Sequence, residues 1–136
     1  MTVTEPATSA PISVHRATRS ADSTLEDPLP LCVEGELDGS TAGAFTVLLA
    51  GVVGEGTGPD VLLDLGRLYR LDVDGLLALR EAAATLARVG RRLALACVRP
   101  RVREFLAGAG AEALVPVFGT LEQAAEHTRL SRPLSC

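Results

Sequence analysis

The sequence predicts an α/β domain in which helices pack against a mixed, mostly parallel β-sheet. Two observations predict this fold class. First, near-continuous apolar runs at 61–65 (VLLDL) and 93–98 (LALACV) are typical of strands buried on both faces of a parallel sheet. Second, segments with apolar residues at helical spacing alternate with these runs, and strands joined through helices run parallel. With 136 residues, the chain is long enough for one such domain with short tails.

Two strands precede the first helix. Residues 12–17 alternate apolar and polar side chains, which predicts a short edge strand, and 29–37 (LPLCVEGEL) predict a second strand. The segment 38–40 (DGS) then supplies a turn and a helix cap. The helix that follows ends at the glycine-rich segment 54–59, and its apolar stripe consists of Phe45, Leu48, Leu49, Val52 and Val53.

Strands and helices alternate over the rest of the chain. In order, the expected elements are a strand at 61–65, a connection at 66–75, a helix at 75–89, a strand at 93–98, a helix from Pro100 to 108, a strand at 115–118 and a helix from Thr120 to about His127. The expected domain spans 11–128, between flexible tails at 1–10 and 129–136. Its expected core includes Phe45, Leu49, Leu62, Leu76, Leu95 and Phe105.

Composition argues against several classes of protein. The net charge of −4 and the four aromatic residues argue against a nucleic-acid binder. Neither a secretory signal nor an apolar stretch of membrane-spanning length is present, so we expect a cytoplasmic protein that does not enter a membrane. All 13 basic residues are arginine, which suggests a GC-rich, bacterial coding sequence.

The cysteines and histidines do not form a motif in the sequence. Cys32, Cys97 and Cys136 lack CxxC spacing and a Cys/His cluster, so neither a zinc site nor a disulfide framework is indicated. Cys32 and Cys97 are expected to be small buried side chains, and Cys136 to be exposed. His15 and His127 have no motif around them and are expected on the surface.

Catalysis has little support in the sequence. The nucleophile elbow GxSxG, the phosphate-binding GxxxxGK[ST] and the dinucleotide-binding GxGxxG are all absent. We therefore expect a protein that is not an enzyme and that uses no metal or other cofactor.

Three loops at the carboxyl edge of the predicted sheet, at 38–41, 71–75 and 99–101, carry the candidate functional residues. Asp72 and Asp74 could act as an acid/base pair or bind a hard cation, but a helix cap is the favoured interpretation. The third loop and the helix after it carry Arg99, Arg101 and Arg103. These arginines either pair with the two acids or form a contact patch for an acidic partner, and both interpretations stay open.

Three segments resemble STAS domains, the fold of anti-sigma factor antagonists. The segment 33–38 (VEGELD) with Thr41 and Ala42 resembles the family's G-E-L-D-x-x-T-A segment. The segment 61–76 is similar to the family's strand and the D-x-[ST]-G loop that follows it, and 98–106 is similar to the entry of the third helix. The resemblance covers about residues 30–127.

The resemblance implies a phosphorylation switch, from which this chain departs. In the family, the Ser or Thr before the glycine is phosphorylated by a partner anti-sigma factor, a kinase of the histidine-kinase-like ATPase type. Here Asp74 occupies that position, Val73 precedes it, and 59–83 contain neither Ser nor Thr. A phosphoserine carries about −1.5 to −2 charge and an aspartate about −1, so Asp74 either mimics a phosphorylated state or meets an adapted partner. Arg70 is a second departure, because an apolar residue is usual there.

The resemblance implies a regulatory protein–protein interaction module that binds an anti-sigma factor and thereby frees a sigma factor. Alternatives are a STAS subunit of a larger assembly, such as a stressosome-like scaffold or a lipid-transport complex, and a regulator that binds a small molecule or nucleotide. A homodimer is also compatible with the sequence. The expected partner-binding residues are Asp38, Ser40, Asp72, Asp74, Gly75, Arg99 and Arg101.

Overall fold

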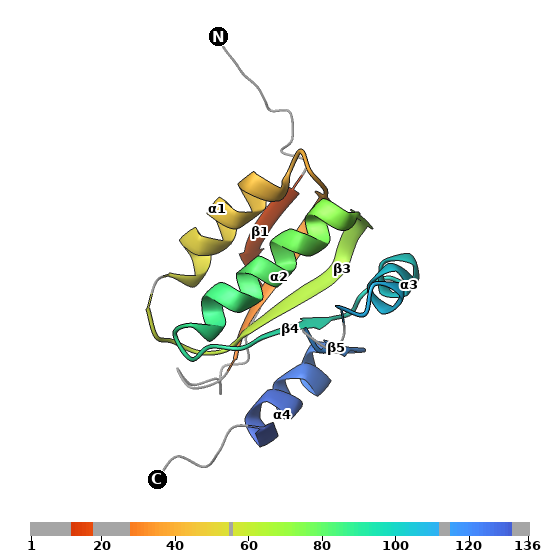
Figure 1. The fold of residues 1–136 in the computed structure, drawn as a ribbon. Coiled ribbons are helices and arrows are strands. Elements are labelled where there is room, and N and C mark those ends of the chain that lie inside the picture. Colours follow the sequence, from red (N-terminus) through yellow and green to blue (C-terminus); the bar gives the residue numbers. More distant parts are fainter. Residues whose placement is uncertain (1–11, 18–27, 55, 112–114, 132–136) are drawn as a thin grey trace.

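The computed structural model describes residues 12–17, 28–54, 56–111 and 115–131, of which the last three are described by their backbone only. The fold class is as predicted (Figure 1). In chain order the elements are β1 (Ile12–Arg16), β2 (Leu29–Leu37), α1 (Ala42–Val53), β3 (Val61–Leu71), α2 (Val73–Ala87), β4 (Leu93–Ala96), α3 (Pro100–Gly108), β5 (Val117–Phe118) and α4 (Leu121–Ser131).

The sheet has five strands in the order β1-β2-β3-β4-β5. β1 runs antiparallel to β2, and the other neighbouring pairs run parallel, as expected for strands joined through helices. Parallel pairing brings the carboxyl ends of β2 and β3 to the same edge, where Leu37 pairs with Leu71. The loops before α1 and α2 therefore start side by side.

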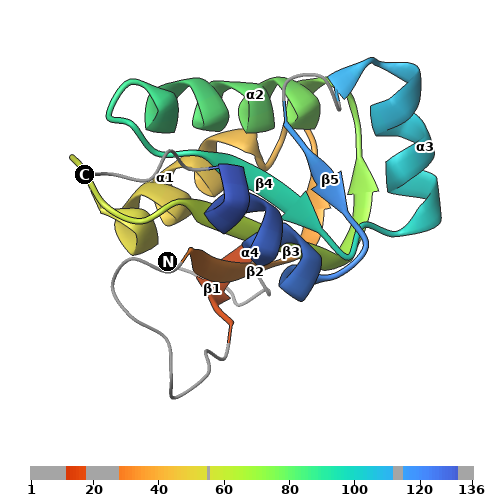
Figure 2. The ribbon, with the colours of Figure 1, turned by 90° about the horizontal axis from the view of Figure 1, so that it is seen from below.

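Helices cover the sheet unevenly on its two faces. α1 and α2 lie next to each other on one face, and α4 lies on the other against β3, β4 and β5 (Figures 1 and 2). The main core fills the first face, with Phe45 of α1 and Leu79 of α2 buried against strand residues such as Leu31 and Leu63. A smaller cluster around Leu62 packs under α4. α3 lies at the end of the sheet from which α2 starts (Figure 2).

Most of the expected core is confirmed. Phe45, Leu49, Leu62, Leu76 and Leu95 are all buried. Phe105, however, is only half-buried, because α3 turns Val102 and Leu106 into the core and leaves Phe105 at its margin. Leu48 is likewise wrong as a member of the α1 stripe, since it is 37% exposed. Cys32 and Cys97 are half-buried free thiols rather than buried ones.

Several predicted boundaries are wrong. β3 continues to Leu71 through the segment expected to be a connection, with Leu68 and Leu71 buried and Arg67, Tyr69 and Arg70 exposed. Accordingly, α2 starts at Val73 rather than Gly75. β4 stops at Ala96, because Cys97 adopts a left-handed backbone conformation with φ 60°. β5 has two residues rather than four.

The end of the domain also differs from the prediction. α4 continues to Ser131, three residues into the segment expected to be a tail. The expected tail at 1–10 and the expected exposure of Cys136 fall outside the described residues. Within the described part of the chain, no helix combines the length and the apolar character needed to cross a membrane.

Candidate functional site

The site begins at the junction of β3 and α2, where Asp72 caps the helix. Asp72 has an extended backbone, and its Oδ1 accepts a hydrogen bond of 2.9 Å from the Gly75 N–H. This bond satisfies one of the amide donors left free in the first turn of a helix. The Asp72 N–H also donates to the Leu37 carbonyl at 3.4 Å. The cap interpretation of this acidic pair is therefore confirmed for Asp72.

Gly75 allows α2 to press against the sheet edge. It is buried, and a Cβ atom at this position would overlap the Leu37 carbonyl oxygen and press on the Leu71 side chain. A residue with any side chain would therefore force the helix away from the ends of β2 and β3. Packing therefore requires glycine at this position, and the role of Gly75 in partner binding stays a prediction.

Asp74 is exposed in the first turn of α2 and faces the loop before α1. A Cβ atom on Gly39 would lie 2.8 Å from Asp74 Oδ2, so the absence of a side chain at Gly39 makes room for the carboxylate. A negative charge at a helix N-terminus is also favoured by the helix dipole. Two of the predicted site loops, at 38–41 and 71–75, thus meet at Gly39 and Asp74.

The loop before α1 is held by its own hydrogen bonds. Ser40 donates to Asp38 Oδ1 from its backbone N–H (2.9 Å) and from its hydroxyl (2.6 Å). The buried Thr41 hydroxyl donates to the Glu36 carbonyl (2.8 Å) and accepts from the Asp38 N–H (2.9 Å). The Ser40 hydroxyl lowers the pKa of the Asp38 carboxyl below its ordinary value, and the positive charge of Arg70 adds to this. Asp38 is therefore ionised at neutral pH.

Among the described residues, no ion pair joins Arg99, Arg101 or Arg103 to Asp72 or Asp74, and the other interpretation, a contact patch for an acidic partner, stays a prediction. Arg99 contacts β3: its Nη1 donates to the Gly66 carbonyl (3.1 Å), and its guanidinium lies 4.7 Å from the centre of the Tyr69 ring. Arg101 and Arg103 are exposed on α3. The cation whose charge reaches the Asp38 loop is Arg70, which pairs with Glu36 in the β2–β3 register. In the sequence, Arg70 departs from the apolar residue that is usual in the family, but no pattern places it in the site.

A groove leads away from this rim between α1 and α2. It has a volume of about 440 Å³, with Gly39 and Asp74 at one end, and it is also lined by Ala42, Gly43, Thr46, Leu77, Ala78 and Glu81. Leu77 and Val73 lie on the outer side of the first half of α2 and are 50% and 61% exposed. We refer to the loops 38–41 and 72–75 together with this groove as the rim surface.

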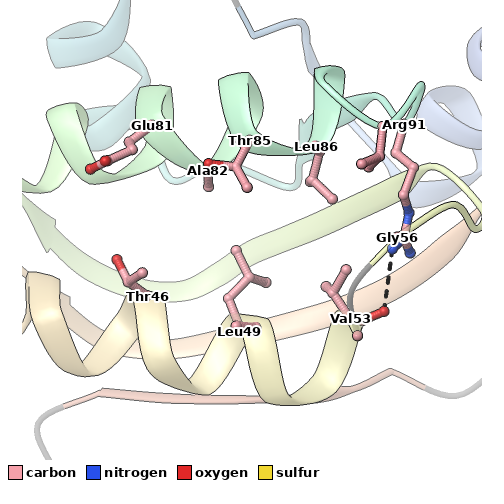
Figure 3. Close-up of a pocket in the computed structure, with 12 residues that line it drawn as sticks. Thr46, Leu49, Val53, Gly56, Glu81, Ala82, Thr85, Leu86 and Arg91 are labelled. Atoms are coloured by element: carbon pink, nitrogen blue, oxygen red, sulfur yellow. Dashed lines mark hydrogen bonds between the residues drawn. The ribbon is translucent and has the colours of Figure 1, made fainter.

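A second hollow lies between the later halves of the same two helices (Figure 3). Its volume is about 430 Å³, and it shares Thr46 and Glu81 with the groove. At its far end Arg91, only 2% exposed, donates from Nε to the Pro59 carbonyl (2.8 Å) and from Nη1 to the Val53 carbonyl (3.3 Å). Burial lowers the pKa of Arg91. None of the predicted site residues lines this hollow, whose buried arginine no sequence pattern indicated.

Sequence comparison assigns a family to this arrangement. The family model described as the STAS domain matches residues 21–124. The chain belongs to the STAS domain family. A Bordetella bronchiseptica protein named as a candidate anti-sigma factor antagonist, BtrV, is 30% identical to this STAS domain over 109 residues, covering 80% of this chain and 93% of that protein.

Solved structures agree with the family. An anti-sigma factor antagonist from Mycobacterium paratuberculosis is 25% identical, with a TM-score of 0.65, covering 86% of this chain and 95% of that one. The murine anion transporter Slc26a9 matches 88% of this chain with a TM-score of 0.75 at 14% identity, which shows a shared fold alone. This STAS domain spans 22% of the length of that transporter.

Proposed function

We propose that this STAS domain is a regulatory interaction module that binds an anti-sigma factor through the rim surface. The observation that carries the proposal is the position of Asp74 beside Gly39. Its exposed carboxylate places a negative charge where the loops before α1 and α2 meet. The similarity to BtrV and to the mycobacterial antagonist supports the choice of partner. By analogy with that family, binding would release a sigma factor that the anti-sigma factor holds.

The polar groups of the rim surface favour binding over catalysis. Asp72 is engaged as the cap of α2, the Ser40 hydroxyl donates to Asp38, and the Thr41 hydroxyl donates to the Glu36 carbonyl. Each of these groups is engaged within its own loop, whereas Asp74 points into the space beside Gly39. A partner that presents Arg or Lys side chains matches this carboxylate, and the exposed Val73 and Leu77 supply apolar contact area beside it.

We further propose that the partner is of the kinase type and that phosphorylation at Asp74 does not control its binding. The D-x-D-G sequence of 72–75 carries a carboxylate where the family carries its phosphoacceptor hydroxyl. A carboxylate cannot take up a phosphoryl group as a stable ester in the way a serine does. It instead supplies a constant charge of about −1, which is smaller than the −1.5 to −2 of phosphoserine.

A phosphorylation assay tests the switch. The protein is incubated with ATP and the kinase-type anti-sigma factor from its native host, and peptides are examined by mass spectrometry. We expect no phosphate within 59–83 in the natural protein and phosphate on the introduced serine in Asp74→Ser. Stoichiometric phosphate on Tyr69, Ser40 or Thr41 of the natural protein would contradict the proposal.

A binding assay tests the surface. We expect a pull-down from the native host to recover an anti-sigma factor with the natural protein but not with Asp74→Arg. The control Glu104→Arg, at an exposed position of α3, should still recover it. Recovery of a transporter or of subunits of a larger assembly, in place of an anti-sigma factor, would contradict the proposal. It would favour the alternative of a STAS subunit of a larger assembly.

A further inference from the structure

A polar cluster lies on the sheet face opposite α1 and α2, away from the rim surface. On β1 and β2 the alternate side chains Ile12, Val14, Leu31 and Val33 fill the main core. Because successive side chains of a strand point to opposite faces, His15, Cys32 and Glu34 face the other way. Among the described elements, α4 packs on that face against β3, β4 and β5 rather than against β1 and β2.

The three side chains bring three different metal-binding atoms together. His15 is the direct cross-strand partner of Cys32, and Glu34 follows two residues later on the same face of β2. One imidazole nitrogen, the Cys32 Sγ and one Glu34 carboxylate oxygen all lie within 4.8 Å of one another. Ligand atoms around a tetrahedral zinc ion are about 3.2–3.7 Å apart, so small side-chain rotations suffice to close the set.

The charges around the cluster favour a cation. Asp64 on β3 pairs in register with Cys32, so two carboxylates, those of Glu34 and Asp64, flank the thiol. The nearby cation is Arg67, whose Nη1 lies 3.3 Å from Glu34 Oε2, and the side chains of this pair are 69% and 36% exposed. An ion pair this exposed contributes little, so Glu34 can leave it for a metal. Asp64 Oδ1 already accepts from the Gly66 N–H and is not needed as a ligand.

We propose that His15, Cys32 and Glu34 bind one Zn²⁺ ion. Nitrogen, sulfur and oxygen donors together suit zinc, whereas Mg²⁺ and Ca²⁺ prefer oxygen alone. Three protein ligands leave the fourth position to water. The ion would tie the edge strand β1 to β2, so its effect is on the stability of that edge rather than on the rim surface. Sequence spacing hid this set, because His15 and Cys32 are 17 residues apart and meet only through strand pairing.

The test uses a protein in which Cys97 and Cys136 are replaced by serine, so that Cys32 is the one remaining thiol. Titration with Co²⁺, a spectroscopic substitute for zinc, should give a thiolate-to-cobalt charge-transfer band that saturates at one equivalent. Zn²⁺ should displace the cobalt and raise the melting temperature, and a chelator should reverse the rise. Absence of the charge-transfer band, or no change in melting temperature with Zn²⁺, would overturn the proposal.

Single substitutions in that background identify the ligands. Cys32→Ser should abolish the band, and His15→Ala and Glu34→Gln should each weaken Zn²⁺ binding at least about tenfold, as measured by calorimetry. The control His127→Ala removes the other histidine, which packs on Phe118, and should leave affinity unchanged. Arg67→Met frees Glu34 and should tighten binding by up to about fivefold. Affinity that is insensitive to His15→Ala and Glu34→Gln would also overturn the site.

Discussion

The Asp74 carboxylate lies against Gly39, where a Cβ atom would come within 2.8 Å of Oδ2. This contact joins the first turn of α2 to the loop before α1. Both loops follow parallel strands that end together, with Leu37 beside Leu71. The sheet edge thus sets where the first turn of α2, which carries the exposed carboxylate, meets the loop before α1.

Gly75→Ala should destabilise the fold by about 1–3 kcal/mol, the usual cost of forcing extra volume into a packed site. The added methyl would overlap the Leu37 carbonyl and push α2 off the sheet edge. Gly51→Ala is the matched control, because nothing lies within 4 Å of a Cβ atom there and alanine favours the helix by about 0.5–1 kcal/mol. Urea denaturation measures both; equal destabilisation by the two variants would contradict the tight approach at Gly75.

Ser40→Ala should raise the pKa of Asp38 toward its ordinary value of 3.8, because it removes the hydroxyl that donates to Oδ1. A carboxyl whose pKa is lowered on folding stabilises the fold above its ordinary pKa and loses that contribution as the pH falls through the lowered pKa. Ser40→Ala should therefore flatten the loss of stability below pH 3.8. NMR titration of the Asp38 carboxyl checks the shift, and an unchanged pKa would contradict the role of the hydroxyl.

Arg91→Met should lower the free energy of unfolding by about 2–3 kcal/mol, since the Pro59 and Val53 carbonyls would lose their buried donor. Arg80→Met, on the exposed face of α2, is the control and should change stability by less than about 0.5 kcal/mol. Thermal and urea unfolding measure both. An Arg91→Met variant as stable as Arg80→Met would show that the second hollow does not depend on this guanidinium.

Leu106→Ala should destabilise the protein by about 2–5 kcal/mol, because Leu106 is fully buried. Phe105→Ala should destabilise the protein by less than about 3 kcal/mol, the lower end of the loss for a fully buried phenylalanine, because Phe105 is only half-buried. The order of the two losses in urea denaturation tests the rotation of α3. A larger loss for Phe105→Ala would mean that Phe105, as the sequence predicts, faces the core.

The sequence predicts the strands and helices well where apolar periodicity is unbroken. It fails at the end of β3, where Arg67, Tyr69 and Arg70 interrupt the apolar run although Leu68 and Leu71 remain buried. A bulged register between β2 and β3 breaks the simple alternation there. Local patterns cannot show such an irregularity, because it depends on the partner strand.

The candidate site was predictable only in part, because some of its contacts are local and others depend on which strands pair. Local capping chemistry identifies Asp72, and the order of parallel strands brings the loops of Asp38 and Asp74 together. The partner of Arg99 was not predictable, because the Gly66 carbonyl and the Tyr69 ring lie in a segment that the sequence assigns to a loop. Likewise, only the pairing of β1 with β2 places His15 beside Cys32.

In the proposed complex Asp74 contacts the anti-sigma factor, and calorimetric titration of that partner with the natural protein and with Asp74→Ser tests this contact. Asp72 remains the cap of α2, and loss of the Asp74 charge from the first turn should cost only about 0.3–1 kcal/mol of helix-dipole stabilisation, so the fold should persist. Glu104→Gln serves as a charge-matched control. Losing a charge from the interface should change the Kd at least about tenfold. Weaker binding is expected, because the partner's basic side chains would lose the carboxylate that they match. Tighter binding would mean that Asp74 mimics phosphate and would contradict that charge match. An unchanged Kd for Asp74→Ser would contradict a contact between Asp74 and the partner.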